Sequence, residues 1–191
     1  MSQRTDLGQS YIPPSTAVAW VATAGAVGAL PYVAMKAYWA WGGTMGKPEH
    51  LNIADEFEKN GAPELLVWLE RHGIDFTAVG MALGITLLAG LTRPWGQVFP
   101  RWVLFLRGRR VPRWLPLTPG WASAAAVGSY GAVGLSQILT GNLGTKHLAG
   151  MSPPVFVMGF VGFFSIGVSL GVCSLSYQRR TRPQRTAISP A

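Results

Sequence analysis

The chain has 191 residues, of which 49% are hydrophobic and only 13% are charged, and its net charge is +8. A soluble domain usually carries about a quarter charged residues, so the composition argues against an ordinary soluble protein. The single cysteine, Cys173, excludes an intrachain disulfide, a CxxC redox pair and a cysteine-cluster metal site. We expect a packed thiol there, with palmitoylation as the alternative.

Long uncharged stretches define the fold class. Residues 16–35, 76–92 and 114–145 carry no charge, and residues 147–178 carry none apart from His147. Each stretch reaches the roughly 17–25 residues that a helix needs to cross a bilayer. We therefore predict an all-α, polytopic membrane protein, a bundle of four transmembrane helices at about 15–41, 74–92, 120–143 and 154–177. The first stretch is too long for the core of a signal peptide, so we expect no cleavage.

Proline and glycine give this four-helix domain (15–177) its internal detail. Pro31 is expected to kink the first helix because an internal proline removes one backbone hydrogen bond. Small residues recur at helical spacing in the later helices, where they let membrane helices approach closely. We predict helix contacts at Gly80 and Gly84, at Ala124, Gly128, Gly131 and Gly134, and at Gly167 and Gly171.

The distribution of charge predicts the orientation. Seven of the eight acidic residues lie in or beside the loop 42–73, whereas six arginines lie in the loop 93–119 and four in the tail 178–191. Lysine and arginine concentrate on the cytoplasmic side of membrane proteins. We expect a multi-pass protein of the cell (inner) membrane, with the tails 1–14 and 178–191 in the cytoplasm. The loop 42–73 then lies outside, and the loop 93–119 lies inside.

Both large loops contain amphipathic patterns. In "APELLVWLERHG", Leu65, Trp68 and Leu69 share one helical face, which predicts a short extracytoplasmic amphipathic helix; Ile53 and Phe57 form a weaker pair before it. In "FPRWVLFL", apolar residues recur at the same helical spacing from position 99 to 106. We expect a short interfacial helix on the cytoplasmic leaflet there.

Lys36 is the one charged residue that falls inside a predicted helix near the membrane. Its ammonium either extends to the headgroups or contacts an anionic ligand, together with Tyr38 and Gln137. No Asp or Glu lies deep within a predicted span, since Asp75 stands at a helix end. This disfavours a carboxylate proton relay of the kind used by many pumps.

The arginines of the second loop are predicted to contact lipid headgroups, because anionic lipids of the inner leaflet attract basic groups beside a membrane. The residues concerned are Arg101, Arg107, Arg109, Arg110 and Arg113. The bilayer and its anionic lipids are thus the expected partners, with a second copy or a membrane-complex subunit as a further one. Nucleic acid is not expected, since the basic residues follow one membrane face.

Three histidines, His50, His72 and His147, all fall on the predicted outer side. Three imidazoles can hold zinc or copper, but their spacing matches no metal motif and solvated side chains are the simpler interpretation. The HExxH, GxSxG, P-loop and GxGxxG patterns are missing. We expect no cofactor, and the sequence leans against an enzyme.

Three short segments resemble an uncharacterised family of small four-helix bacterial integral membrane proteins. They are "YWAWGG" from position 38, "RPWG" from position 93 and "RRVPRWLPL" from position 109. The chain departs from the family pattern by inserting "QVFPRWVLFLRG" and by its acidic first loop. The resemblance implies the four-helix fold and carries no activity with it.

The function predicted from the sequence is that of a structural, binding or accessory component of the membrane, without a catalytic site of its own. Two alternatives remain open. One is a small transporter or channel-like component, which requires a water-accessible path near Lys36 and Gln137. The other is an outward-facing enzyme or metal-binding protein that uses His50, His72 and His147.

Overall fold

The computed structural model describes residues 11–142 and 150–182, and within these ranges it contains helices and no strands. This confirms the predicted all-α class. The elements, in chain order, are α1 (Thr16–Ala40), α2 (Ile53–Lys59), α3 (Glu64–Arg71), α4 (Phe76–Thr92), the 3-10 turn η1 (Pro94–Gly96), α5 (Trp114–Leu139) and α6 (Pro153–Arg180).

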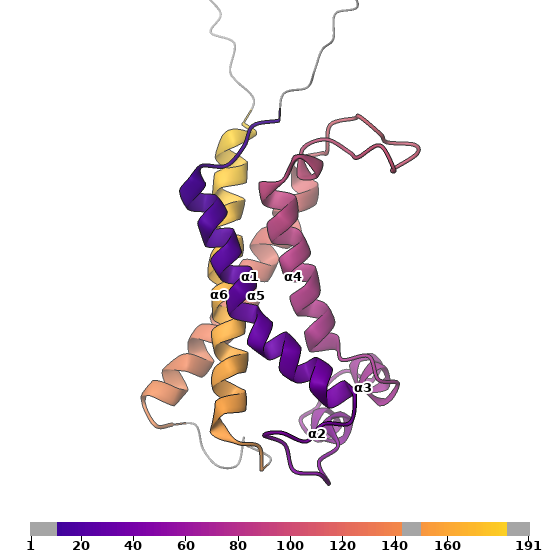
Figure 1. Ribbon diagram of the computed structural model, residues 1–191, viewed down its shortest axis with the longest axis vertical. Coiled ribbons are helices and arrows are strands. Elements are labelled where there is room, and N and C mark those ends of the chain that lie inside the picture. Colours follow the sequence, from indigo (N-terminus) through magenta and orange to yellow (C-terminus); the bar gives the residue numbers. More distant parts are fainter. Residues whose placement is uncertain (1–10, 143–149, 183–191) are drawn as a thin grey trace, which may run out of the picture.

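The long helices form an elongated bundle around α6. Figure 1 shows α1, α4 and α6 running along the long axis, with α5 behind them. Helix α6 packs most extensively on α5 and α1, and α4 packs on both α6 and α1. Helices α2 and α3 gather at one end, which we call the capped end. The first turn of α1, the last turn of α6 and residues 93–113 lie at the other end, which we call the basic end.

Local capping explains where several helices begin. The Ser15 hydroxyl accepts a hydrogen bond from the backbone N–H of Val18 and so starts α1. The Asp75 carboxylate accepts from the N–H groups of Thr77 and Ala78, both at 2.9 Å, and so starts α4. Such side-chain acceptors satisfy N–H groups that have no partner within the helix. The predicted boundaries 15–41 and 74–92 are therefore confirmed to within two residues.

The boundaries predicted for the last two long helices need correction. Helix α5 begins at Trp114 rather than 120 and ends at Leu139 rather than 143. Pro116 lies in its first turn, where the missing N–H costs little because the first four N–H groups of a helix have no partner within it. Pro119 is accommodated inside the helix. Helix α6 continues past the predicted end at 177 to Arg180.

The prediction of an interfacial helix over residues 99–106 is wrong. These residues form successive turns, and the chain folds back on itself so that Val98 and Arg110 make an antiparallel bridge. The backbone of Phe99 is used in this fold-back, since its N–H donates to Arg109 and its carbonyl accepts from Gly108. In a helix the same Phe99 carbonyl would accept from residue 103 instead. Glycine suits position 108, where φ is +73°. We call residues 97–111 the arginine loop.

The first loop contains two helices rather than one. The expected amphipathic helix is confirmed as α3, and the weaker pair Ile53 and Phe57 lies in a second helix, α2. Arg71 of α3 forms ion pairs with Asp55 and Glu58, which links the two helices. Phe57 stacks against Phe76 at a ring-centroid distance of 4.9 Å, so the pair also contacts the start of α4.

Glycines determine how closely the helices approach. A Cβ atom at Gly131 would lie 2.3 Å from the backbone nitrogen of Phe164, and one at Gly167 would lie 2.3 Å from Gly128. The helix contacts predicted at these glycines are thereby confirmed, and they join α5 to α6. Gly84 lies against Ile166, but a Cβ atom at Gly80 would meet nothing within 4 Å. The sequence pattern alone did not separate these two glycines.

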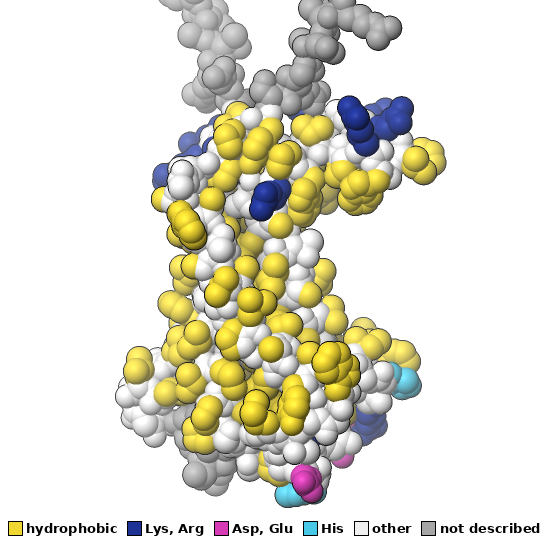
Figure 2. Space-filling view, viewed as in Figure 1, with side chains coloured by type: hydrophobic (Ala, Val, Ile, Leu, Met, Phe, Trp, Pro, Cys, Tyr) yellow, Lys and Arg dark blue, Asp and Glu magenta, His cyan; other side chains and the backbone are white. Residues whose placement is uncertain are grey.

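Two helices, α1 and α6, are long and apolar enough to cross a membrane. Helices α3 and α4 pass the same test only as a pair that bends by 97°. The described part of the chain thus has two to three helices fit to span a bilayer, which indicates membrane association. Figure 2 agrees with this, because hydrophobic side chains cover the visible middle of the bundle while charged ones gather at its ends.

Candidate functional site

A buried ion pair joins α1 to the start of α4 at the capped end. The ammonium Nζ of Lys36 lies 2.5 Å from Oδ2 of Asp75, and the two side chains are only 6% and 16% exposed. The second carboxylate oxygen, Oδ1, caps α4 and accepts a 2.5 Å hydrogen bond from the Thr77 hydroxyl. Asp75 therefore fixes the start of one helix and neutralises a cation from another.

Aromatic rings complete the surroundings of the ammonium. Lys36 Nζ lies 5.9 Å from the ring centroid of Tyr32 and 5.3 Å from that of Trp39, both within cation–π range. The Tyr32 hydroxyl shares a 2.7 Å hydrogen bond with Thr77. The ion pair is thus enclosed by groups from α1 and α4, which restricts its contact with water.

Glu70, near the end of α3, adds a second carboxylate to this cluster. Burial and the nearby negative charge of Asp75 raise the pKa of Glu70 to about 6, although Lys36 and the N–H of Phe76 oppose the shift. Its Oε2 atom is buried and has no hydrogen-bond partner among the described residues. By contrast, burial by itself would raise the pKa of Asp75, but the charge of Lys36 and the hydrogen bonds from Lys36, Thr77 and Ala78 together lower that pKa.

The cluster carries more negative than positive charge when both carboxylates are ionised. Lys36, Asp75 and Glu70 then sum to −1, so an anionic ligand would have to displace Asp75 and approach Glu70. Anion binding by Lys36 stays a prediction. What the arrangement does directly is connect α1, α3 and α4 at one point, because each helix supplies one charged group.

The other two residues expected beside Lys36 lie elsewhere. Tyr38 is 45% exposed, and its ring lies against Gly43 just after α1. Gln137 is exposed on α5, a helix that packs on α6 and α4. The structure therefore pairs Lys36 with a carboxylate that the sequence analysis had placed only at a helix end.

The structure describes two of the three histidines, His50 and His72. His147 lies outside the described residues. Nδ1 of His72 lies 2.7 Å from the Trp68 carbonyl, and its ring stacks on the Trp68 indole. Within residues 11–142 and 150–182, no group of three His, Cys, Asp or Glu side chains is placed to hold a metal ion.

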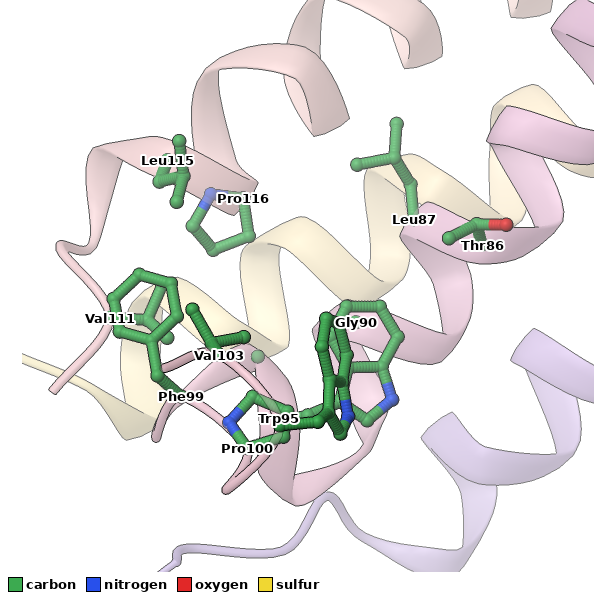
Figure 3. A pocket seen from close by; sticks show the side chains of 12 residues that line it. Thr86, Leu87, Gly90, Trp95, Phe99, Pro100, Val103, Val111, Leu115 and Pro116 are labelled. Carbon is green, nitrogen blue, oxygen red and sulfur yellow. The ribbon is translucent and has the colours of Figure 1, made fainter. Parts of the chain in front are cut away.

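An apolar pocket of about 700 Å³ lies at the basic end (Figure 3). Its walls come from the second half of α4, from η1, from the arginine loop and from the first turn of α5. Its lining includes the large apolar residues Leu87, Trp95, Phe99, Val103, Val111 and Leu115. The hydroxyl of Thr86, which also lines it, donates to the Ala82 carbonyl within α4. The pocket therefore presents a hydrocarbon surface.

Two contacts fix one wall of this pocket. The Trp95 indole lies directly on Gly90, where an added Cβ atom would come within 2.9 Å of the ring. The Tyr177 hydroxyl, on α6, donates to the Gly96 carbonyl at 2.7 Å. The turn η1 is thus held between α4 and α6, and the indole is held at the pocket.

Four predicted headgroup residues, Arg101, Arg107, Arg109 and Arg110, are exposed on the arginine loop. Among the described residues, ion pairs join only Lys36 to Asp75, Lys59 to Glu56, and Arg71 to Asp55 and Glu58. None of the four arginines has a carboxylate partner there. In Figure 2, basic side chains lie on the upper side of this projecting loop, and hydrophobic ones lie on its underside and at its tip.

The fifth predicted headgroup residue has a different position. Arg113 is half-buried and donates to the Gln178 carbonyl and to the Thr181 hydroxyl, both at 3.1 Å. It therefore binds the last turn of α6, where carbonyl groups lack helical partners. Arg180, the last residue of α6, in turn donates to the carbonyls of Leu91 and Ile12.

Sequence reasoning missed Asp75, Glu70 and the pocket. For Asp75 a signal existed, because an aspartate directly before an uncharged helix is a typical N-cap. Lys36 stands near the end of α1 and Asp75 stands directly before α4, so the two residues lie at the same depth in the bundle. The pocket left no such signal, since it depends on how residues 97–111 fold back over α4.

The chain matches no protein-family model, no curated protein and no solved structure.

Proposed function

We propose that the protein is a four-span membrane protein with both termini in the cytoplasm, and that it is a lipid-binding or accessory component rather than an enzyme. The observation that carries this proposal is the separation of charge along the bundle. Arginines gather at the basic end, the carboxylates of α2, α3 and Asp75 gather at the capped end, and α4 and α5 between them carry no charge.

The proposal adds α4 and α5 to the two helices that are fit to span a bilayer by themselves. Helix α4 has 17 residues and is about 26 Å long at 1.5 Å per residue, close to the thickness of the hydrocarbon layer. Helix α5 is longer but contains many small and hydroxyl residues. Such residues suit a helix that packs closely on another, as α5 does on α6 through Gly131.

The positive-inside rule supports the orientation. The start of α1 and the end of α6 lie at the same end of the bundle, as an even number of spans requires (Figure 1). The arginine loop lies at that end and exposes Trp102, Leu104 and Phe105 by 78–91%. Exposed aromatic and aliphatic side chains beside arginines are suited to a membrane surface, where rings enter the interface and guanidinium groups contact phosphates.

Labelling of single cysteines tests the topology. In a Cys173→Ser background, cysteine would replace Asn60, Arg107, Asn142 or Arg182 in turn, and intact cells would be treated with a membrane-impermeant thiol reagent. Four spans place Asn60 and Asn142 outside, so these two should be labelled directly. Arg107 and Arg182 should react only after permeabilisation.

The same four positions distinguish the alternatives. If only α1 and α6 cross the membrane, position 107 will react like positions 60 and 142. If the orientation is reversed, positions 107 and 182 will react in intact cells instead. Either pattern would overturn the proposed topology, and Cys173→Ser alone gives the background because it contains no cysteine.

A further inference from the structure

The apolar pocket at the basic end raises the question of its occupant. Its volume of about 700 Å³ falls within the range of roughly 300–1,000 Å³ typical of ligand pockets. It lies between two helices, α4 and α5, and beneath a loop. The lining consists of aliphatic and aromatic side chains with few polar atoms (Figure 3).

Exposed arginines adjoin several of the apolar residues that line the pocket. Pro100 and Trp102 line the pocket, and Arg101 stands between them in the chain; Val111 also lines it, and Arg110 is its neighbour. Both arginines are exposed, and neither has a carboxylate partner in the described ranges. An apolar interior whose lining residues adjoin exposed arginines in the chain matches a molecule that has a hydrocarbon chain and an anionic head.

We infer that the pocket binds one anionic phospholipid of the cytoplasmic leaflet, with an acyl chain between α4 and α5 and its phosphate at Arg101 and Arg110. This inference rests on the proposed function, because it requires the arginine loop to lie at the membrane surface. A second copy of the chain would bring another basic end to the same place, and like charges oppose that contact. Charge complementarity therefore favours the lipid.

The pocket is held in shape before any ligand enters. Trp95 rests on Gly90, the Tyr177 hydroxyl holds Gly96, and the Val98–Arg110 bridge closes the base of the arginine loop. A site that is already formed loses little conformational entropy on binding. This distinguishes the pocket from the general lipid-exposed surface of the helices, where chains exchange without a fixed position.

A matched pair of substitutions on α4 tests the chain site. Leu87 lines the pocket, whereas Leu83 lies one turn away on the same helix and is 59% exposed. The full-length protein would be delipidated in an uncharged detergent and titrated with phosphatidylglycerol or phosphatidylcholine, with bound lipid counted by native mass spectrometry. Leu87→Trp should weaken phosphatidylglycerol binding at least about tenfold, since several methylene groups lose their place, and Leu83→Trp should not.

Two further variants separate loss of binding from loss of folding, and the chain site from the headgroup contact. Val103→Trp fills the pocket from the loop side and should reproduce the effect of Leu87→Trp, with circular dichroism confirming the helical content of both. Arg101→Gln combined with Arg110→Gln should remove the preference for phosphatidylglycerol over phosphatidylcholine. All three results together support the inference.

Each other outcome contradicts it in a recognisable way. If the arginine variant weakens binding but Leu87→Trp behaves like Leu83→Trp, the headgroup contact of the proposed function stands and the chain site is wrong. If Leu87→Trp weakens both lipids equally and the arginine variant changes nothing, the ligand is not anionic. If no variant changes binding, the chain site and the proposed headgroup contact both fail.

Discussion

The ammonium of Lys36, on α1, lies 2.5 Å from the carboxylate of Asp75, the residue that caps α4. One carboxylate oxygen binds the cation and the other binds the N–H groups that begin the helix. The pair therefore couples the position of α1 to the start of α4. Both groups are largely withdrawn from water, so neither can lose its partner without a large cost.

Removing one member of this pair should destabilise the protein more than removing an exposed pair. Lys36→Met leaves Asp75 buried without its cation and should lower the free energy of unfolding by about 3 kcal/mol, as measured by denaturant titration in micelles. Adding Asp75→Asn should recover part of this loss, because asparagine still caps the helix while the uncompensated charge is gone.

Lys59→Met provides the matched control for this experiment. Lys59 pairs with Glu56 at the surface, where it is 70% exposed, and exposed pairs contribute roughly 0–1 kcal/mol. An effect of Lys36→Met no larger than that of Lys59→Met would show that the buried pair does not hold the capped end together.

The stability of the capped end should depend on pH through Glu70. Its pKa of about 6 lies above the ordinary glutamate value because burial and Asp75 disfavour the charged form, while Lys36 partly opposes them. A raised pKa means that the folded state binds the proton more tightly than the unfolded state. The stabilisation is thus fully present below about pH 4.3, the unfolded value, and is lost as the pH rises through 6.

Comparison with Glu70→Gln isolates this contribution. The unfolding midpoint of the native protein, relative to that of the variant, should fall between pH 5 and pH 7.5. Groups that titrate equally in both proteins cancel in the difference. Parallel midpoint curves for the two proteins would contradict the assignment to Glu70.

Two glycine-to-alanine substitutions should separate close helix contacts from open ones. Gly131→Ala places a Cβ atom 2.3 Å from the backbone of Phe164, so α5 and α6 must move apart. Overpacking of this kind typically costs about 1–3 kcal/mol. Gly80→Ala meets nothing within 4 Å and should leave the thermal midpoint unchanged or slightly raised. Equal midpoints for the two variants would contradict the close packing of α5 on α6.

The helices could be predicted because they depend on local properties of the chain. Uncharged stretches, the hydroxyl of Ser15 and the glycines around position 131 each act through neighbours in sequence or through a simple helical repeat. The amphipathic helix α3 was likewise readable from the spacing of Leu65, Trp68 and Leu69. The pattern over residues 99–106 was equally regular, yet it forms turns because backbone pairing between Phe99 and Arg109 competes with the helix.

The sequence by itself determined the all-helical class and the opposite charge of the two ends, because hydrophobic length and charge placement do not depend on the packing partner. Only the tertiary structure decided which groups meet. Lys36 and Asp75 are separated by two loop helices, and Leu87 and Leu115 by the arginine loop. Their encounter depends on how α1, α4 and α5 pack around α6, which involves many weak contacts at once and leaves no periodic signal in the chain.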